Sequence, residues 1–560
     1  MSVSEPSARQ VMYLSGDQAV ARGALEAGIS VATGYPGNPS TRALEFILRH
    51  RRENNVYAEW STNEKVAVEV AAGVAWAGKR ALVTMKMSGL NVAADSLLSI
   101  AHSGTNGGLA IYVADDVGTY YGMVEQDSRY YALLGAMPML LPADPQEAKD
   151  MTIFAYTLSE EVGAPVMVRS TTAVANSYQD VAVGQPQKLN RWPHFERRPE
   201  QFTKAVSAWC LAQHANAMER LERAQQFMAP WNPLVLYPQK RLGVVAAGVC
   251  WQYLQEVLSN SDIILNTLKL DSFNPFPREK MGRLLSCCDG VLILEELEPL
   301  IEWRTKALAL EIGARVKIEG KEDGFLPRVG DYTVNMVQEA VWRFTGRDVS
   351  TEQSTPRETP QDSFLVLPRE PHFCPGCPHI ATYQAIKQAL RDLGYKKEEV
   401  ITTGDIGCTI IGMHQPFEVC WTEVAMGSSI GLAQGFKLAG LQRPVLAAIG
   451  DGTFFHAGIP GLLNAVKGKI PITVVVLDNG WIAMTGHQPH PGTGVTAGGE
   501  LTDRADIAAL ARACGVQDVK VVDSFYLEAL VGALKDSIRY PGVSVVISKG
   551  ECALTRDRRH

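Results

Sequence analysis

The sequence lacks the features that mark membrane, secreted and nucleic-acid-binding proteins. No apolar run approaches the ~18 residues that a membrane-spanning helix needs. The first ten residues, MSVSEPSARQ, have neither a positively charged start nor an apolar stretch, so they do not form a secretory signal. The 53 basic and 60 acidic residues give a formal net charge of −7, which favours neither a nucleic-acid backbone nor an anionic membrane as partner. We therefore expect a cytoplasmic protein that binds neither nucleic acid nor membrane.

Cysteine is scarce as well. Ten cysteines in 560 residues are too few for a disulfide scaffold, and the cytoplasm would keep them reduced. Six are dispersed along the chain and are typical of small buried hydrophobic residues: Cys210, Cys250, Cys287, Cys288, Cys420 and Cys514. The remaining four have spacings that allow another use.

What the sequence does have is globular composition and a repeated alternation of strand and helix patterns. It is 46% hydrophobic and 20% charged, and its length suggests about three or four domains. Short apolar runs alternate with helical patterns in three α/β units, separated by a polar, partly helical connector and by a linker without apolar period. The expected segments are 1–180, 181–238 (connector), 239–348, 349–362 (linker) and 363–560.

The most specific motif is Gly450-Asp451-Gly452, followed after 25 residues by Asp478-Asn479. Each part ends a continuous apolar run of the kind that forms parallel strands buried on both faces. Ligands of open parallel sheets bind beyond the carboxyl ends of strands, so Asp451 and Asn479 are expected at one edge of a site.

The chemistry of this motif suits a metal-bound diphosphate. Carboxylate and amide oxygens are hard ligands that Mg²⁺ prefers, and a backbone carbonyl near Trp481 can supply a third. Gly452 lets the backbone approach a phosphate closely. The combination is the diphosphate-anchoring motif of thiamine diphosphate enzymes, and the alternative is two ordinary turns between strand and helix.

The four remaining cysteines suggest a metal or cluster site. Cys374 and Cys377 form a CxxC pair, Cys408 follows 31 residues after Cys377, and Cys552 follows the last apolar run, SVVISKG. Thiolates at such spacings ligate zinc or iron–sulfur clusters. Zinc, or four unrelated thiols, are the alternatives to a cluster.

With these motifs in place, the chain resembles the large-subunit family of indolepyruvate:ferredoxin oxidoreductases, within the 2-oxoacid:acceptor oxidoreductases. The matching segments run through the whole chain in family order: GYPGNPST (34–41), NEKVAVEVAAG (63–73), LVTMKMSGLNVAAD (82–95), EQDSRYYA (125–132), DPQEAKDM (144–151), LEELEP (294–299), CPGCPH (374–379), GDIGCT (404–409), GDGTFFHAGIPGLLNAV (450–466) and AMTGHQPHPGTG (483–494).

The resemblance implies three doubly wound α/β domains: a pyrimidine-binding domain, a transketolase-C-like domain and a diphosphate-binding domain. It implies oxidative decarboxylation of a bulky or aromatic 2-oxoacid with coenzyme A, giving an acyl-CoA, CO₂ and two electrons. It assigns one [4Fe–4S] cluster to Cys374, Cys377, Cys408 and Cys552. It also assigns Glu64 to the aminopyrimidine of the cofactor, with Glu59 and Glu69 as less favoured candidates.

Two departures from the family accompany the resemblance. The chain shows no ferredoxin-like Cys-rich tail, so we expect a separate iron–sulfur or flavin subunit to accept the electrons, beside a small gamma-type subunit in a dimer of heteromers. Asn38 stands where the family commonly has a threonine that contacts the substrate carboxylate. An amide can still hydrogen-bond a carboxylate, at a different reach.

Further residues are candidates for the same site. His487 and His490 follow the metal-binding turn and are expected to face the thiazolium or the substrate as acid–base or hydrogen-bonding groups, unless they only order the loop. Asn91 is expected to face the cofactor from the opposing domain. Thr409 and Thr453 are expected to bond diphosphate oxygens.

Two other functions remain open on sequence alone. The chain could be a thiamine-dependent decarboxylase or carboligase without a redox step, which predicts no cluster. It could instead be a catalytically silent scaffold or electron-transfer subunit, against which the intact Glu64, Asp451 and Asn479 argue.

Overall fold

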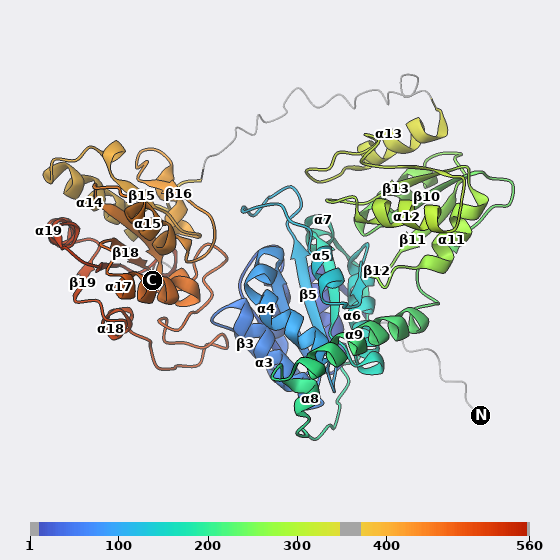
Figure 1. Cartoon of the computed structure of the whole chain (residues 1–560), viewed down its shortest axis with the longest axis horizontal. Coiled ribbons are helices and arrows are strands. Elements are labelled where there is room, and N and C mark those ends of the chain that lie inside the picture. The colour runs from blue at the N-terminus through green and yellow to red at the C-terminus, as the bar shows by residue number, and fades with distance from the viewer. Residues whose placement is uncertain (1–9, 348–370, 557–560) are drawn as a thin grey trace. The chain divides into compact units, whose positions relative to one another are not determined.

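The computed structural model describes residues 10–347 and 371–556. The chain forms two compact units, Met1–Ser363 and Phe364–His560, coloured blue to yellow and orange to red in Figure 1. Most of the N-terminal segment taken as lacking a signal, and the whole expected linker 349–362, lie outside the described residues.

The first unit contains a large sheet built from apolar runs. Across the described residues it has seven strands, of which six run parallel and the seventh, β12, pairs antiparallel with β6. Strands β4, β5 and β7 are buried along their whole length, as expected for parallel strands covered on both faces. The order is β12 (Ser272–Asn274), β6 (Met139–Leu140), β7 (Val166–Thr171), β5 (Leu109–Asp115), β4 (Ala81–Lys86), β2 (Val31–Gly34) and β3 (Tyr57–Trp60).

Helices cover this sheet and begin where the sequence provides caps. Asn63 and Asp144 each accept a backbone N–H at a helix start, and Gly163 ends one helix in the left-handed conformation. Helix α1 packs on α2 and α6, and α3 packs on α4. The helices are α1 (Gly16–Glu26), α2 (Thr41–Asn54), α3 (Glu64–Trp76), α4 (Met87–Ser103), α5 (Arg129–Leu134), α6 (Pro145–Val162) and α7 (Thr172–Asn176).

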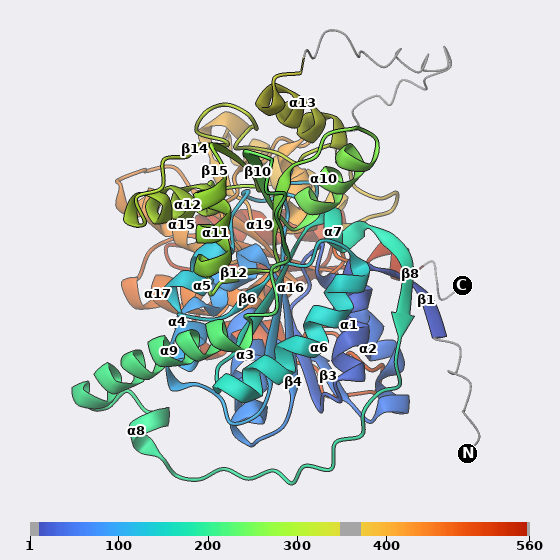
Figure 2. The ribbon, with the colours of Figure 1, turned by 90° about the vertical axis from the view of Figure 1, so that its right-hand side faces the viewer.

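A connector leads from this sheet to the next. It follows the small antiparallel pair β1 (Gln10–Ser15) and β8 (Tyr178–Val183), runs as an extended segment and enters α8 (Pro199–Phe202) and α9 (Ser207–Phe227), as Figure 2 shows. Throughout the described residues, no helix combines the length and the apolar character that crossing a bilayer requires.

The second sheet of the first unit has five strands in the described part of the chain. Strands β10, β11, β13 and β14 are parallel, and β9 pairs antiparallel with β11. The strands are β14 (Lys317–Glu319), β13 (Gly290–Leu294), β10 (Leu242–Ala247), β11 (Asn266–Leu270) and β9 (Leu234–Val235), with helices α10 (Val249–Ser259), α11 (Arg278–Cys287), α12 (Leu300–Glu311) and α13 (Val334–Thr345).

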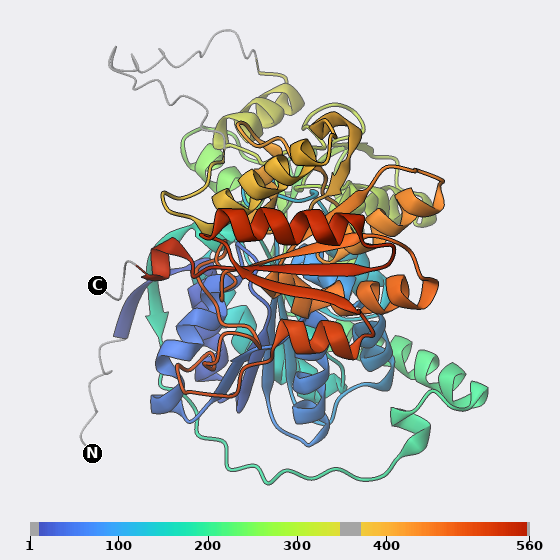
Figure 3. The same ribbon diagram turned by 90° about the vertical axis from the view of Figure 1, so that its left-hand side faces the viewer.

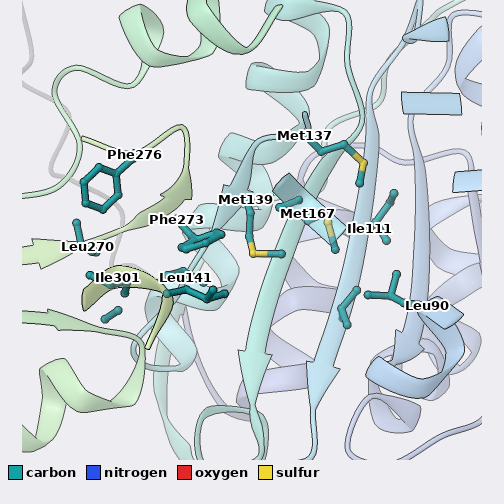
Figure 4. Close-up of a cluster of buried hydrophobic side chains, with 14 of the residues drawn as sticks. Leu90, Ile111, Met137, Met139, Leu141, Met167, Leu270, Phe273, Phe276 and Ile301 are labelled. Carbon is teal, nitrogen blue, oxygen red and sulfur yellow. The ribbon is translucent and has the colours of Figure 1, made fainter. Parts of the chain in front are cut away.

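The two sheets of this unit share one hydrophobic core. Figure 4 shows Met139, Met167 and Phe273 of the first sheet continuing into Leu270 of the second sheet and Ile301 of α12. Burial of such side chains from water stabilises the contact between the two sheets.

A buried ionic cluster lies at the same junction. The guanidinium of Arg129, 1% exposed, pairs with Asp127 Oδ2 at 2.6 Å and with Glu295 Oε2 at 2.5 Å. It also donates to the backbone carbonyls of Glu296 and Glu298. The EQDSRYYA and LEELEP segments therefore meet.

The second unit is a doubly wound sheet whose six described strands are all parallel (Figure 3). One hydrophobic cluster under α15, α17 and α18 and another under α14 and α19 cover its two faces. The order is β16 (Cys420–Thr422), β15 (Ile401–Thr403), β17 (Val445–Gly450), β18 (Thr473–Asp478), β20 (Ser544–Lys549) and β19 (Asp518–Asp523). The helices are α14 (Pro378–Asp392), α15 (Ser428–Leu438), α16 (Asp451–Thr453), α17 (Ile459–Gly468), α18 (Ile507–Ala513), α19 (Leu527–Arg539) and α20 (Ala553–Arg556). The expected α/β class is confirmed, whereas the domain boundaries stay predictions.

Candidate functional site

The Asp451 carboxylate joins the ends of two adjacent parallel strands. Asp451 follows β17 directly, and Asn479 follows β18, which pairs with β17 through Gly450 and Leu477. Asp451 is 3% exposed, and its Oδ2 accepts the backbone N–H groups of Asn479 at 3.1 Å and Gly480 at 2.7 Å. The expected meeting of the two strand ends is therefore present in the structure.

His490 contacts the same carboxylate. Its Nε2 lies 3.0 Å from Asp451 Oδ2, and its Nδ1 accepts the backbone N–H of Gly492 at 3.0 Å. Because Nδ1 accepts, the proton belongs on Nε2, which donates to Asp451. Burial alone would raise the pKa of Asp451, but the contacts with His490 and the Gly452 amide lower it, so the carboxylate is anionic.

Asn479 links three segments of the second unit. Its Oδ1 accepts the backbone N–H of Trp481 at 2.9 Å, and its Nδ2 lies 3.3 Å from Nε2 of His379. Its backbone carbonyl accepts the N–H of Cys552 at 3.2 Å. Burial lowers the pKa of His379 to about 4 despite the nearby Asp451, so this ring is neutral.

This donor set fits a magnesium-bound diphosphate. The buried anionic carboxylate of Asp451 lies beside Asn479, whose side chain carries an amide oxygen, and both are hard oxygen ligands of the kind that Mg²⁺ prefers. A Cβ on Gly452 would come 2.9 Å from Ile482 Cγ1, so glycine is needed for this close packing. A cavity of about 380 Å³, lined in part by Asn479, Trp481 and His490, lies beside the loop.

The two threonines of the expected diphosphate site both contact the loop after β15, although Thr453 itself follows β17. Thr409 Oγ1 donates to the Asp405 carbonyl at 2.7 Å, and Thr453 Oγ1 donates to the Ile406 carbonyl at 3.2 Å. The Asp405 carboxylate accepts backbone N–H groups from Ile406, Gly427 and Ser429. Sequence reasoning missed Asp405, although it lies within GDIGCT.

The four singled-out cysteines gather in this unit. Cys377 N donates to the Cys374 carbonyl at 3.1 Å, in a turn in which Gly376 has φ +72°. Burial, and then the neighbouring thiols of Cys377, Cys552 and Cys374, raise the pKa of Cys408 to about 12. Burial raises the pKa of Cys377 to about 11, with Cys552 and Cys374 adding to the rise. Cys408 therefore lies within electrostatic reach of the other three thiols, and Cys377 within reach of Cys374 and Cys552.

Within residues 10–347 and 371–556, no three side chains of His, Cys, Asp or Glu are placed to share one metal ion. The structure brings Cys408 near the other three thiols but does not arrange three of the four around one metal ion. Their thiolate chemistry fits iron or zinc once deprotonated.

His487 adjoins this cysteine group. Its Nε2 lies 3.3 Å from Cys552 Sγ, and its backbone has φ +66°. Its expected place beside the thiazolium or the substrate stays a prediction.

Glu64 is the buried glutamate of its segment in the first unit. It is 7% exposed, begins α3, and packs so closely that a Cβ on Gly89 would lie 2.8 Å from its Oε1. Glu69 is exposed and bonds Lys65, and Glu59 bonds neighbouring hydroxyl groups. Its burial at the start of a helix of small residues distinguishes Glu64 from Glu59 and Glu69.

Asn38, expected at the substrate carboxylate, and Asn91, expected to face the cofactor, both lie in the first unit, and their roles stay predictions. Asn38 is half-buried after β2, and a Cβ on its neighbour Gly37 would lie 3.0 Å from Lys86 Cβ. Lys86 was not singled out from sequence; its buried Nζ donates to Asp116 Oδ2 at 2.9 Å and to the Gly122 carbonyl at 2.8 Å. Asn91 is exposed and bonds Gln126 and Tyr131.

Comparisons with known proteins match two parts of this chain to thiamine-binding families. The family described as "Thiamine pyrophosphate enzyme, C-terminal TPP binding domain" matches residues 405–548, and the family described as "Pyruvate flavodoxin/ferredoxin oxidoreductase, thiamine diP-bdg" matches residues 22–228. The indolepyruvate oxidoreductase subunit IorA of Methanothermobacter marburgensis is 36% identical over 97% of this chain and 87% of its own length. The IorA subunit of Thermococcus kodakarensis is 37% identical over 97% of this chain and 86% of its own length.

A solved structure was also found similar. It is the 2-oxoglutarate:ferredoxin oxidoreductase from Magnetococcus marinus with 2-oxoglutarate, coenzyme A and succinyl-CoA bound. It covers 60% of this chain and 65% of its own chain, with 16% identity and a TM-score of 0.48.

Proposed function

The chain belongs to the family of indolepyruvate oxidoreductase IorA subunits, and from this premise we propose that it carries the catalytic site for oxidative decarboxylation of arylpyruvates. As a family member it is a subunit of a thiamine diphosphate-dependent 2-oxoacid oxidoreductase. The proposed reaction converts an arylpyruvate and coenzyme A into an aryl-acyl-CoA, CO₂, one proton and two electrons. The aryl substrate is proposed from the name that its relatives carry.

The second unit is proposed to hold the cofactor's diphosphate through Mg²⁺. Asp451 and the Asn479 amide oxygen are the proposed side-chain ligands, and the Trp481 carbonyl is the proposed third. His490 holds Asp451 in place through its Nε2–H. The hydroxyl groups of Thr409 and Thr453 donate to the backbone carbonyls of residues 405 and 406. When the cofactor binds, they are proposed to donate to its diphosphate oxygens instead.

The first unit is proposed to supply the groups that act on the organic parts. Thiamine diphosphate, when bound, provides the electron sink for decarboxylation. Glu64 is proposed to hydrogen-bond the aminopyrimidine, because it is the buried carboxyl of its segment. Asn38 is proposed to hydrogen-bond the substrate carboxylate, and Asn91 to face the cofactor.

Cys374, Cys377, Cys408 and Cys552 are proposed to hold one [4Fe–4S] cluster that accepts electrons singly. Support comes from the proximity of Cys408 to the other three thiols and from the 3.2 Å hydrogen bond that joins Cys552 to Asn479, a proposed magnesium ligand. This last contact is the single observation that carries the proposal. The electrons are proposed to pass to a separate iron–sulfur or flavin subunit, in a dimer of heteromers with a small gamma-type subunit.

The test is cofactor analysis followed by turnover. The complex, purified anaerobically, should contain about four irons and four sulfides per chain beyond those of its partners, with thiamine near one. Indolepyruvate or phenylpyruvate with coenzyme A should then reduce a viologen dye. Cys408→Ser should abolish this reduction, whereas Cys514→Ser, outside the cysteine group, should not.

Other outcomes would favour other functions. Thiamine without iron, together with aldehyde release, would indicate a non-oxidative decarboxylase or carboligase. Zinc in place of iron would make the cysteines structural. Failure to bind thiamine diphosphate with Mg²⁺ present would indicate a silent scaffold. Turnover of pyruvate or 2-oxoglutarate but not of arylpyruvates would contradict the proposed substrate class.

A further inference from the structure

His487 has a backbone conformation that a histidine adopts only at a cost. Its φ of +66° lies in the left-handed region, which residues with a Cβ rarely occupy. The turn that contains it is closed by a two-residue bridge, in which Ile482 N donates to the Gln488 carbonyl at 3.0 Å and Gln488 N donates back at 3.2 Å. Strained backbone of this kind persists where its surroundings fix it, and it gathers at functional sites.

The conformation aims the imidazole at one sulfur atom. Nε2 of His487 lies 3.3 Å from Sγ of Cys552. The backbone of Cys552 is fixed in turn, because its N–H donates to Asn479 and its carbonyl accepts the N–H groups of Thr555 and Arg556. The contact therefore joins two segments that are each held in place independently.

We propose that His487 acts through Cys552, donating an N–H···S hydrogen bond that raises the reduction potential of the cluster held by the four cysteines. The inference rests on the proposed function, since it needs that cluster. A thiolate bound to iron has no proton to give, so the imidazole must be the donor. His487 is then a positioning and tuning residue of the electron-transfer site, and not an acid–base group at the substrate.

The direction of the effect follows from charge. Reduction adds one electron to the cluster and its sulfurs, while the proton stays on Nε2 and no bond between heavy atoms forms or breaks. A hydrogen bond to a ligand sulfur stabilises the more negative, reduced state. Loss of the bond should therefore make the cluster harder to reduce.

His487→Gly is the sharpest variant, because glycine accepts φ +66° without strain and removes only the ring. His487→Asn is its conservative partner, since asparagine tolerates the left-handed region and keeps an N–H donor. Both are made in the complete anaerobic complex. Each is titrated with dithionite while the cluster is followed by electron paramagnetic resonance, the signal being assigned to this chain by its absence in Cys408→Ser.

We expect His487→Gly to shift the midpoint potential to a more negative value at unchanged iron and sulfide content, with His487→Asn between it and the wild type. An unchanged midpoint in His487→Gly would overturn the inference, all the more if turnover fell at the same time, which is the signature of an acid–base role. A wild-type complex without this signal would instead overturn the cluster itself, so the two failures are distinguishable.

Discussion

At the scale of single residues, the site depends on carboxyl groups removed from water and met by N–H donors. Asp451 accepts from Gly452, Asn479 and Gly480 and from the ring of His490. An anion held in this way is ready for a cation, because its pKa is already lowered before any metal binds.

Asp451→Asn keeps the size of the side chain and removes its charge. We expect thiamine diphosphate with Mg²⁺ to bind at least about 100-fold more weakly. Mutating a residue that only hydrogen-bonds a metal ligand already lowers metal affinity by about 10–100-fold, and Asp451 is a proposed ligand itself. Isothermal titration calorimetry measures the change. Asp503→Asn, an exposed position in the same unit, is the control and should bind as the wild type does. Equal affinity in both variants would remove Asp451 from the metal site.

Glu64→Gln tests the other carboxyl group. The amide should leave cofactor binding within a few-fold but lower kcat by roughly 10²–10⁴, the usual contribution of a positioned proton-transfer group. Deuterium exchange at the reactive thiazolium carbon should slow in parallel. Glu69→Gln changes the exposed glutamate of the same helix and should leave both rates unaltered. If Glu69→Gln lowered kcat and Glu64→Gln did not, the aminopyrimidine contact would belong to Glu69 and not to Glu64.

At the scale of elements, two helices are shaped around the Glu64 side chain. Helix α3 begins with Glu64, and α4 packs against it with Gly89 in its first turn. A Cβ at residue 89 would lie 2.7 Å from Glu64 Cγ, which is closer than real contacts allow. The glycine therefore preserves the position of the carboxyl group.

Gly89→Ala should consequently impair activity more than stability. The alanine gains helix propensity of up to about 1 kcal/mol but must displace Glu64. We expect a fall in kcat of at least tenfold with a melting temperature near that of the wild type. Gly73→Ala is the matched control in α3, where a Cβ meets nothing within 4 Å. It should raise stability by roughly 0.5–1 kcal/mol and spare activity, and loss of activity there would point to the helices rather than to Glu64.

How far the sequence predicted these elements depends on the range of the contacts. The strand ends bearing Asp451 and Asn479 could be predicted because each apolar run and the polar residue that ends it are adjacent in the sequence. The contact of His379 with Asn479 could not, since it joins residues 100 positions apart and nothing in CPGCPH indicates it. The three-residue strand β12 was missed for a similar reason, because SFN has no period of its own.

At the scale of the whole molecule, charge as well as apolar contact unites the two sheets of the first unit. Arg129 is buried between Asp127, which precedes α5 beside the first sheet, and Glu295, which follows β13 of the second sheet. Removing the guanidinium would leave both carboxylates buried without their cation, which is far more costly than losing a surface ion pair.

Arg129→Met should therefore destabilise the protein by roughly 3–5 kcal/mol. Thermal unfolding followed by circular dichroism measures the fall in midpoint. Arg328→Met removes the exposed partner of Glu298 from the same region and should leave the midpoint almost unchanged. Similar midpoints for the two variants would show that the buried cluster does not stabilise the junction.

Strand β12 has a consequence for how this protein is made. It comes after all the other strands of the first sheet in the sequence, yet it completes that sheet by pairing with β6. While a ribosome is still adding the residues between them, β6 has an open edge whose N–H and C=O groups can pair with other chains. The first sheet is complete only after β12 has been synthesised, and β12 follows β11 of the second sheet in the sequence. We therefore expect Met1–Ser363 to fold as one unit, and a chain truncated between the two sheets to aggregate during synthesis.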